Sequence, residues 1–222
     1  MDNYGQVAPA NASALATNKV LRNTYTLLSM SLIFSAVMAA VSISVGLSQG
    51  MALGAMIAAI VLVWFVLPKF ENSGMGIAVV FAFTGLMGLS IGPMIGYYLA
   101  IPGGGDIVMT ALGGTGVIFL GLSGYALTTR KDFSFMGGFL FVGLLVVMGF
   151  MIVNIFTQIP AMSLAISAGV ILLMSGLILF DTSRIIHGGE TNYIRATVSL
   201  YLNIHNLFVH LLHLLGAFSG DD

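Results

Sequence analysis

Ionisable side chains occur inside a long apolar segment in the last quarter of the sequence. Asp181 lies within the run from Ala161 to His187, and Arg184 follows it by about one helical turn. An ionised Asp at the centre of a bilayer costs roughly 2.5 to 3.5 kcal/mol, so such a group is expected to face protein or water. Two interpretations remain open: Asp181 pairs locally with Arg184, or it is a titratable acid on an ion or proton route.

The next apolar segment, Ala196 to Phe218, carries a stripe of polar residues. They recur at steps of three and four residues and are Asn203, Asn206, His210 and His213. This spacing places them on one face of a helix, whereas His205 lies off that face. Because a polar side inside a membrane turns toward other helices, we expect this helix to lie at the centre of a bundle.

Three roles are open for the stripe. Neutral imidazoles three residues apart can share a metal ion, but the sequence has no His-Glu-x-x-His pattern and no carboxylate at matching depth. The histidines could instead sense pH or line an ion path, or the stripe could simply form hydrogen bonds between helices, which is common for such groups. The sequence predicts no bound metal or cofactor, and no nucleophile accompanies Asp181 or Glu190, so it does not predict an enzyme.

The composition determines which elements must position these residues. Over 222 residues, 58% are hydrophobic and 7% are charged, with a mean hydropathy of +1.05. A soluble domain of this size could not bury so much apolar surface, and each helical crossing of a bilayer needs on the order of 20 apolar residues. We therefore predict an all-α membrane protein. Net charge of -1 gives no reason to expect nucleic acid, and the absence of Cys excludes disulfides.

Apolar runs, separated by short segments with Pro and Gly, divide the chain into seven predicted membrane spans. The predicted spans are Thr26–Gly46, Met51–Leu67, Met75–Leu99, Ile107–Leu127, Phe135–Phe156, Ala161–His187 and Ala196–Phe218. We expect Pro68 to end the second span, and Pro93 to kink the third. Residues 1–18, rich in Ala, Asn and Ser, are expected to form a disordered cytoplasmic tail, and residues 19–222 a single seven-helix domain.

Small residues recur every four positions along the third span, and they are Thr84, Gly88, Gly92 and Gly96. Such a face lets two helices approach closely, so we expect it to serve packing.

Basic residues set the expected orientation. All seven lie in the N-terminal segment or in the second, fourth and sixth loops: Lys19, Arg22, Lys69, Arg130, Lys131, Arg184 and Arg195. Because Lys and Arg stay on the cytoplasmic side during insertion, the N-terminus is expected in the cytoplasm and the C-terminus in the periplasm. Seven spans place the two termini on opposite sides of the membrane, which agrees with the distribution of basic residues.

Several motifs resemble those of the Bax inhibitor-1 family, also called the transmembrane Bax inhibitor motif family. Its closing motifs are matched by Leu179–Thr182 and Ser199–Phe208, and further likeness extends over Leu21–Tyr25, Phe81–Gly85, Met109–Thr115, Leu127–Asp132 and His187–Thr197. The resemblance covers nearly the whole chain. It implies a seven-helix fold in which the last helix is surrounded by the other six.

The resemblance also implies two kinds of function. Some members are proton-sensitive calcium leak channels, in which an aspartate pair joins the sixth and seventh helices. Bacterial members of the type resembled here bind, and are substrates of, the inner-membrane AAA+ zinc protease FtsH, which works with the membrane regulators HflK and HflC, and they modulate its attack on other membrane proteins. In those members, the cytoplasmic tail is the expected starting point for degradation.

The sequence departs from the leak-channel pattern at one position. Asp181 matches the first aspartate of the pair, but Asn203 stands in the place of the second. An Asp–Asn pair lacks the repulsion between two carboxylates that makes them share a proton, although it can still join the two helices by a hydrogen bond. We therefore expect an inner-membrane modulator of FtsH in contact with the lipid bilayer, with a pH-sensitive calcium leak as the alternative.

Overall fold

The computed structural model describes residues 8–219, with side chains from residue 15 onward, and this part of the chain is helical apart from short loops and turns. Its elements are α1 (Ala8–Ser44), α2 (Gln49–Val61), η1 (Leu62–Val66), α3 (Leu67–Phe70), α4 (Met75–Leu99), α5 (Gly104–Thr129), α6 (Met136–Thr157), α7 (Pro160–Ile186) and α8 (Tyr193–Ser219). Because α2, η1 and α3 form one continuous rod, the described residues contain seven helices long and apolar enough to cross a membrane. The predicted all-helical, seven-span fold is confirmed, and most span ends differ by only a few residues.

The N-terminal segment differs from its prediction. The expected disordered tail covers residues 1–18, of which residues 1–7 lie outside the described residues. Residues 8–18 form the first turns of α1, so the prediction of disorder is wrong for them. Alanine at every second position from Ala8 to Ala16 favours a helix, and Pro9 falls in the first turn, where a missing N–H costs nothing.

The second span continues past Pro68. The predicted stop is wrong because the chain remains helical through Phe70. The turn before the proline is a π-helical segment, in which the N–H of Leu67 donates to the carbonyl of Leu62 five residues earlier. A wider turn gives the proline ring the room that a regular α-helical turn does not.

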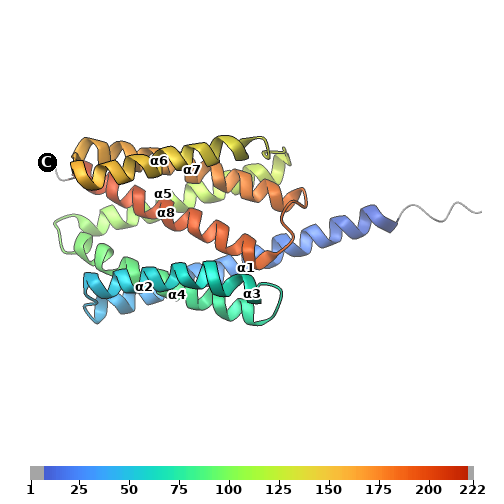
Figure 1. Cartoon of the computed structure of the whole chain (residues 1–222), viewed down its shortest axis with the longest axis horizontal. Helices are drawn as coiled ribbons and strands as arrows, with labels where there is room; N and C mark the ends of the chain where they lie inside the picture. The colour runs from blue at the N-terminus through green and yellow to red at the C-terminus, as the bar shows by residue number, and fades with distance from the viewer. Residues whose placement is uncertain (1–7, 220–222) are drawn as a thin grey trace, which may run out of the picture.

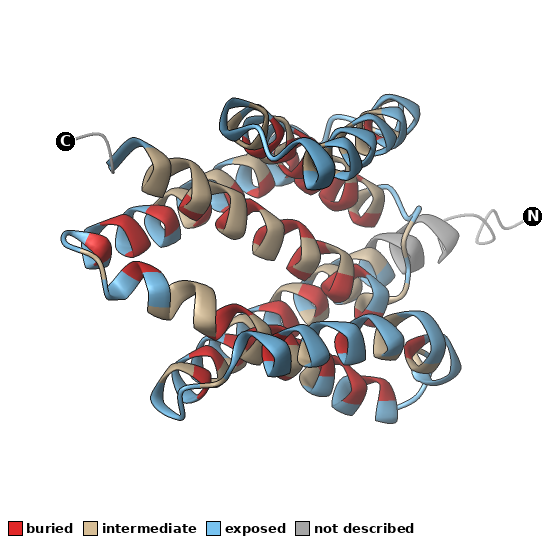
Figure 2. Ribbon diagram, turned by 60° about the vertical axis from the view of Figure 1, so that its left-hand side comes forward, coloured by how far each residue is buried: buried red, intermediate tan, exposed pale blue. Residues whose placement is uncertain are grey.

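Helix α8 lies between two groups of helices (Figure 1). It packs against α7 and α5 on one side and against α1 and α4 on the other, but not against α2 or α6. The expectation that all six other helices surround it is therefore corrected to four. The reason is layering, because α2 packs on α4 and α6 packs on α7, which leaves both on the outside. Figure 2 shows these outer helices largely exposed, as helices facing lipid must be.

The small-residue face of α4 packs closely against α1. A Cβ atom on Gly88 would overlap the backbone carbonyl oxygen of Ser35, and one on Gly92 would overlap the side chain of Ser42. The predicted packing role of this face is thus confirmed. Gly113 of α5 differs, because a Cβ atom there would meet no other atom within 4 Å.

Pro93 lies inside α4 without breaking it. A proline lacks the N–H that would normally bond the carbonyl four residues earlier, which here belongs to Leu89. The Ser42 hydroxyl of α1 donates to that carbonyl at 2.9 Å. The neighbouring helix therefore supplies the hydrogen bond that the proline removes.

Candidate functional site

The carboxyl group of Asp181 joins α7 to α8. Its side chain is buried, and its Oδ2 atom accepts hydrogen bonds from Ser199 Oγ at 2.6 Å and from Asn203 Nδ2 at 2.8 Å. Both donors lie on α8, one helical turn apart. Because one acceptor oxygen holds two donors, the contact fixes the relative depth of the two helices.

Arg184 does not pair with Asp181. The described residues show no ion pair between them, so the local pairing considered from the sequence is wrong. The guanidinium group instead donates to the carbonyl of Gly189 at 3.1 Å and lies 5.6 Å from the ring centre of Phe180. Arg184 thus binds a carbonyl of the loop that follows α7, and not the carboxylate.

The histidines of the stripe share a partner on α7. His210 Nδ1 lies 3.1 Å and His213 Nδ1 lies 3.0 Å from Ser167 Oγ. A hydroxyl has a single proton to donate, so with neutral rings it donates to one histidine and accepts from the other. The two rings then have opposite tautomers. Asn206 differs, because its amide donates within α8 to the carbonyl of Leu202 at 2.8 Å.

Three of the four stripe residues thus contact α7, and the serines that complete these contacts were not among the predicted site residues. Ser199 could have been found, because it extends the stripe by one turn before Asn203. Ser167 gave no signal, since serine is common in membrane helices. Within the described residues, no group of three or more His, Asp or Glu side chains is placed to hold a metal ion.

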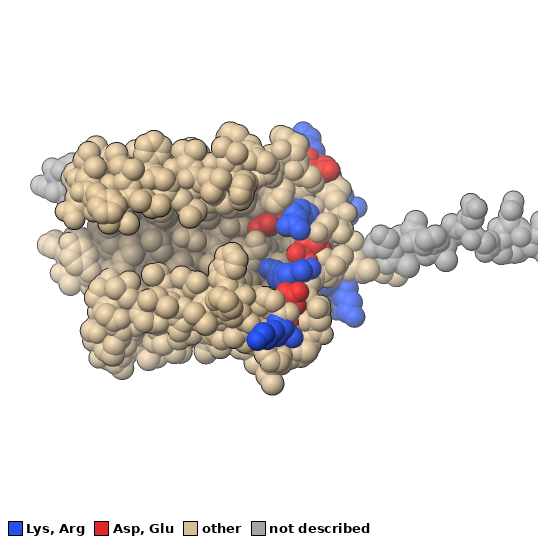
Figure 3. Space-filling model, in the orientation of Figure 1, with Lys and Arg blue, Asp and Glu red and all other residues tan. Residues whose placement is uncertain are grey.

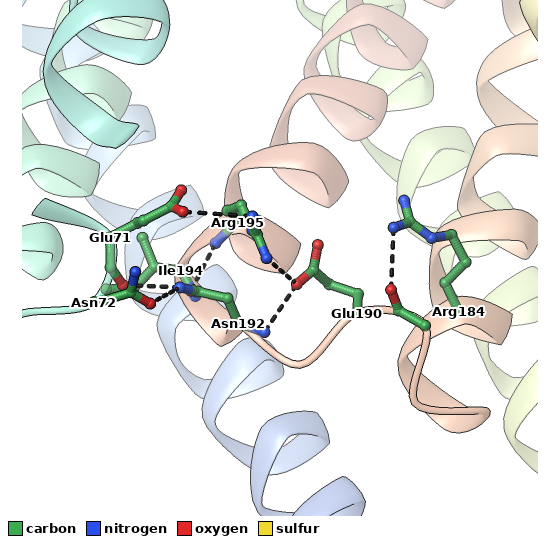
Figure 4. Close-up of polar contacts among 8 residues, drawn as sticks. Glu71, Asn72, Arg184, Glu190, Asn192, Ile194 and Arg195 are labelled. Atoms are coloured by element: carbon green, nitrogen blue, oxygen red, sulfur yellow. Dashed lines mark hydrogen bonds and ion pairs between the residues drawn. The ribbon is translucent and has the colours of Figure 1, made fainter. Parts of the chain in front are cut away.

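A second polar cluster lies at one end of the bundle, in the loop before α8 (Figure 4). The Asn192 Oδ1 atom accepts from the backbone N–H groups of Ile194 at 2.9 Å and Arg195 at 3.3 Å, so it caps the start of α8. Its Nδ2 group donates to the backbone carbonyl of Glu71 at 2.9 Å and to Asn72 Oδ1 at 3.0 Å. One side chain thereby starts α8 and joins it to the turn between α3 and α4.

Charged groups reinforce the same junction. Arg195 forms ion pairs with Glu71 at 3.4 Å and with Glu190 at 3.2 Å, and Figure 4 shows it between them. Its side chain is 50% exposed, so each pair is worth no more than about 1 kcal/mol. Glu190 also accepts from the backbone N–H of Asn192 at 2.8 Å. The pairs therefore orient the loop more than they stabilise it.

The loop between α5 and α6 is held at this end as well. His187 Nε2 lies 3.1 Å from the carbonyl of Arg130, and Ser183 Oγ accepts from the N–H of Phe133 at 2.9 Å. In the same loop, hydrogen bonds from Ser134 lower the pKa of the exposed Asp132 carboxyl below its usual value. Loop residues from three parts of the sequence thus form one polar surface.

Figure 3 shows that charged side chains on the visible face gather at this end, whereas the rest of that face is uncharged and is hollowed between the two groups of helices. The helix termini that carry a Lys or Arg all lie at this end, because consecutive helices run in opposite directions and these termini alternate along the chain. We call this the basic end.

Comparison with known proteins gives the family. The sequence profile described as "Inhibitor of apoptosis-promoting Bax1" matches residues 17–220. The chain belongs to the Bax inhibitor-1 family. Its relatives include a membrane protein of Vibrio cholerae, 52% identical over 208 residues that make up 94% of this chain and 93% of the relative.

Another relative of this Bax inhibitor-1 protein is the Escherichia coli K12 protein "Modulator of FtsH protease YccA", 50% identical over 221 residues and the full length of both chains. The counterpart in E. coli O6:H1, equally similar, is named "Inner membrane protein YccA". These names denote a modulator and a membrane protein, and none denotes an enzyme.

The family motifs of this Bax inhibitor-1 protein coincide with its interhelical contacts. The Tyr201 hydroxyl lies 2.6 Å from Ser35 Oγ of α1, and the Thr182 hydroxyl lies 3.3 Å from Tyr25 of α1. With Asp181, these residues join α7 and α8 to each other and to α1. The motifs therefore specify how the halves of the bundle meet.

Proposed function

We propose that this protein binds the protease FtsH in the bacterial inner membrane, modulates its degradation of other membrane proteins, and is itself a substrate. Identity of 50% to YccA along the full length of both chains carries the proposal, because no part of the relative is left without a counterpart here. In the proposed topology the basic end faces the cytoplasm and the C-terminus faces the periplasm.

The first part of α1 supports a role as substrate. Helix α1 extends well beyond the other helices (Figure 1), and Val20 is its first side chain in the described part that packs against the core. An isolated helix of about 12 residues is only marginally stable in water. A protease that pulls on this segment would therefore meet little resistance before Val20.

The rest of α1 would resist extraction. Beyond Val20 it is held by the Ser35–Tyr201 contact to α8, by the Ser42 hydrogen bond to α4, and by the glycine face of α4. A substrate that is gripped easily and extracted slowly occupies its protease. Occupancy of this kind would reduce the degradation of other membrane proteins without any catalytic group on the modulator.

The lifetime of the protein in cells tests this proposal. Deleting Met1 to Asn18 should lengthen its half-life in cells with active FtsH and leave it unchanged in cells lacking FtsH. A matched variant, in which residues 8–18 are replaced by a Gly/Ser segment of equal length, should be degraded at least as fast as the natural chain because an unstructured handle remains. Equal lifetimes of all three chains in cells with active FtsH would show that FtsH does not use residues 1–18 to start degradation.

A further inference from the structure

A cavity of about 300 Å³ lies between α1, α4 and α5, with α8 as its floor. We call it the acyl slot. Its walls include Leu32, Ala36, Ala40 and Ile43 of α1 and Val108 and Leu112 of α5, and its floor includes His205. Eleven of the fifteen side chains that line it are apolar, and the alanines of α1 provide the space.

The slot is closed toward the basic end and open to the side. The rings of Tyr25 and Phe119 meet there, with centroids 6.1 Å apart. Farther along, the backbones of α1 and α5 do not pack against each other, and Ala36 and Ala40 are exposed at the rim. In a bilayer, the opening therefore faces the hydrocarbon of the lipid.

The polar groups of the lining offer little to water. The hydroxyls of Ser35 and Tyr201 contact each other at 2.6 Å, and Thr115 donates to the carbonyl of Ala111 at 2.7 Å. The lining contains one histidine, His205, whose ring is stacked on that of Tyr201. Among the polar side chains of the lining, it alone has no hydrogen-bond partner in the described residues. An ordered water in a cavity needs two to four polar partners, so hydrocarbon fits this space better than water.

The dimensions of the slot match one lipid chain. From Leu32 to Ile43, α1 rises roughly 16 Å, which is close to the half-thickness of a bilayer core of about 30 Å. A methylene group fills about as much space as a water molecule, on the order of 30 Å³, so the slot holds on the order of ten methylenes. We propose that the slot binds one acyl chain of a phospholipid from the leaflet opposite the basic end.

Photocrosslinking of the full chain tests this assignment. The protein is reconstituted in vesicles of phosphatidylethanolamine and phosphatidylglycerol that contain a trace of phosphatidylcholine with a diazirine in the middle of one acyl chain. After irradiation, mass spectrometry should find the lipid on His205, whose imidazole traps a carbene well, in addition to residues of the outer surface such as Leu172. Native mass spectrometry of the protein in mild detergent should find one retained phospholipid.

Filling the slot should abolish the crosslink to His205 and the retention of a phospholipid. The variant Ala36→Phe with Ala40→Phe places two rings at the rim, and the single change Ala36→Leu is a milder form should the double variant not fold. Ala58→Phe on α2 is the matched control, because Ala58 is also exposed but lies away from the slot. Crosslinking at His205 that survives in a folded, filled variant would overturn the proposal. So would labelling of Leu172 without His205, or a retained molecule whose mass is not that of a phospholipid.

Discussion

Asn192 offers the sharpest test of how the two halves of the bundle are joined at the basic end. Its oxygen caps α8, and its amide group donates to the turn between α3 and α4. Replacement by Ala removes both functions. Replacement by Ser removes only the second, because a serine hydroxyl can still cap a helix but is too short to reach Glu71 and Asn72.

The structure sets the expected magnitudes. An N-cap is worth about 1 kcal/mol, and each neutral hydrogen bond about 0.5 to 1.5 kcal/mol. The two bonds from Asn192 to the α3–α4 turn are at most part-buried, which puts them at the lower end of that range. We therefore expect Asn192→Ser to lower the free energy of unfolding by about 1 to 2 kcal/mol and Asn192→Ala by about 2 to 3 kcal/mol.

The measurement is the free energy of unfolding in detergent micelles, from denaturant titrations followed by far-UV circular dichroism. Asn72→Ala is the control, because it removes one acceptor of the same amide and leaves the cap intact. The ranking expected is natural chain, then Asn72→Ala, then Asn192→Ser, then Asn192→Ala. Equal stability of the Ser variant and the natural chain would refute the inference that this side chain joins the halves.

Two further outcomes are expected, and a third measurement tests the calcium-leak alternative. Gly88→Ala should destabilise the protein by about 1 to 3 kcal/mol because the new Cβ atom overlaps α1, whereas Gly113→Ala should be neutral or slightly stabilising. Equal effects of the two substitutions in denaturant titrations would contradict the close packing of α1 on α4. Ser134→Ala should raise the pKa of Asp132 in an NMR titration. Because that pKa is lowered in the folded protein, the ionised Asp132 carboxyl contributes stability above its usual pKa near 3.8, and this contribution is lost as pH falls through the lowered pKa. An Asp132 titration that the substitution leaves unchanged would refute the bond. If the protein were a calcium leak, reconstituted liposomes would show calcium flux that changes on Asp181→Asn, and an absence of flux between about pH 6 and 8 would end that alternative.

The sequence predicts the spans well because each needs a long apolar run, and it predicts the inward side of α8 because Asn203 and His210 share a helical face. It does not predict the partners of charged groups. Arg184 lies one turn from Asp181 in the sequence, yet its guanidinium group donates to the carbonyl of Gly189 in the following loop. Local spacing gives proximity, but competing partners decide which contact forms.

Contacts between distant loops were also beyond the sequence. Asn192 contacts Asn72 across 120 positions, and no periodic pattern indicates such a pair. The wide turn before Pro68 depends on how the chain relieves a steric clash, which a simple rule that proline ends a helix overlooks. The helical start of α1 was missed because an Ala-rich segment was interpreted by its polarity rather than by its helix propensity.

We propose that this protein engages FtsH and thereby limits the action of FtsH on other membrane proteins. The most direct test is a reconstitution in which purified FtsH degrades a reporter membrane protein in the presence of increasing amounts of this chain. The two proteins should copurify, degradation of the reporter should slow, and this chain should itself be slowly consumed. An unchanged rate of reporter degradation, with this chain intact and not bound to FtsH, would show that the protein is not a modulator of FtsH.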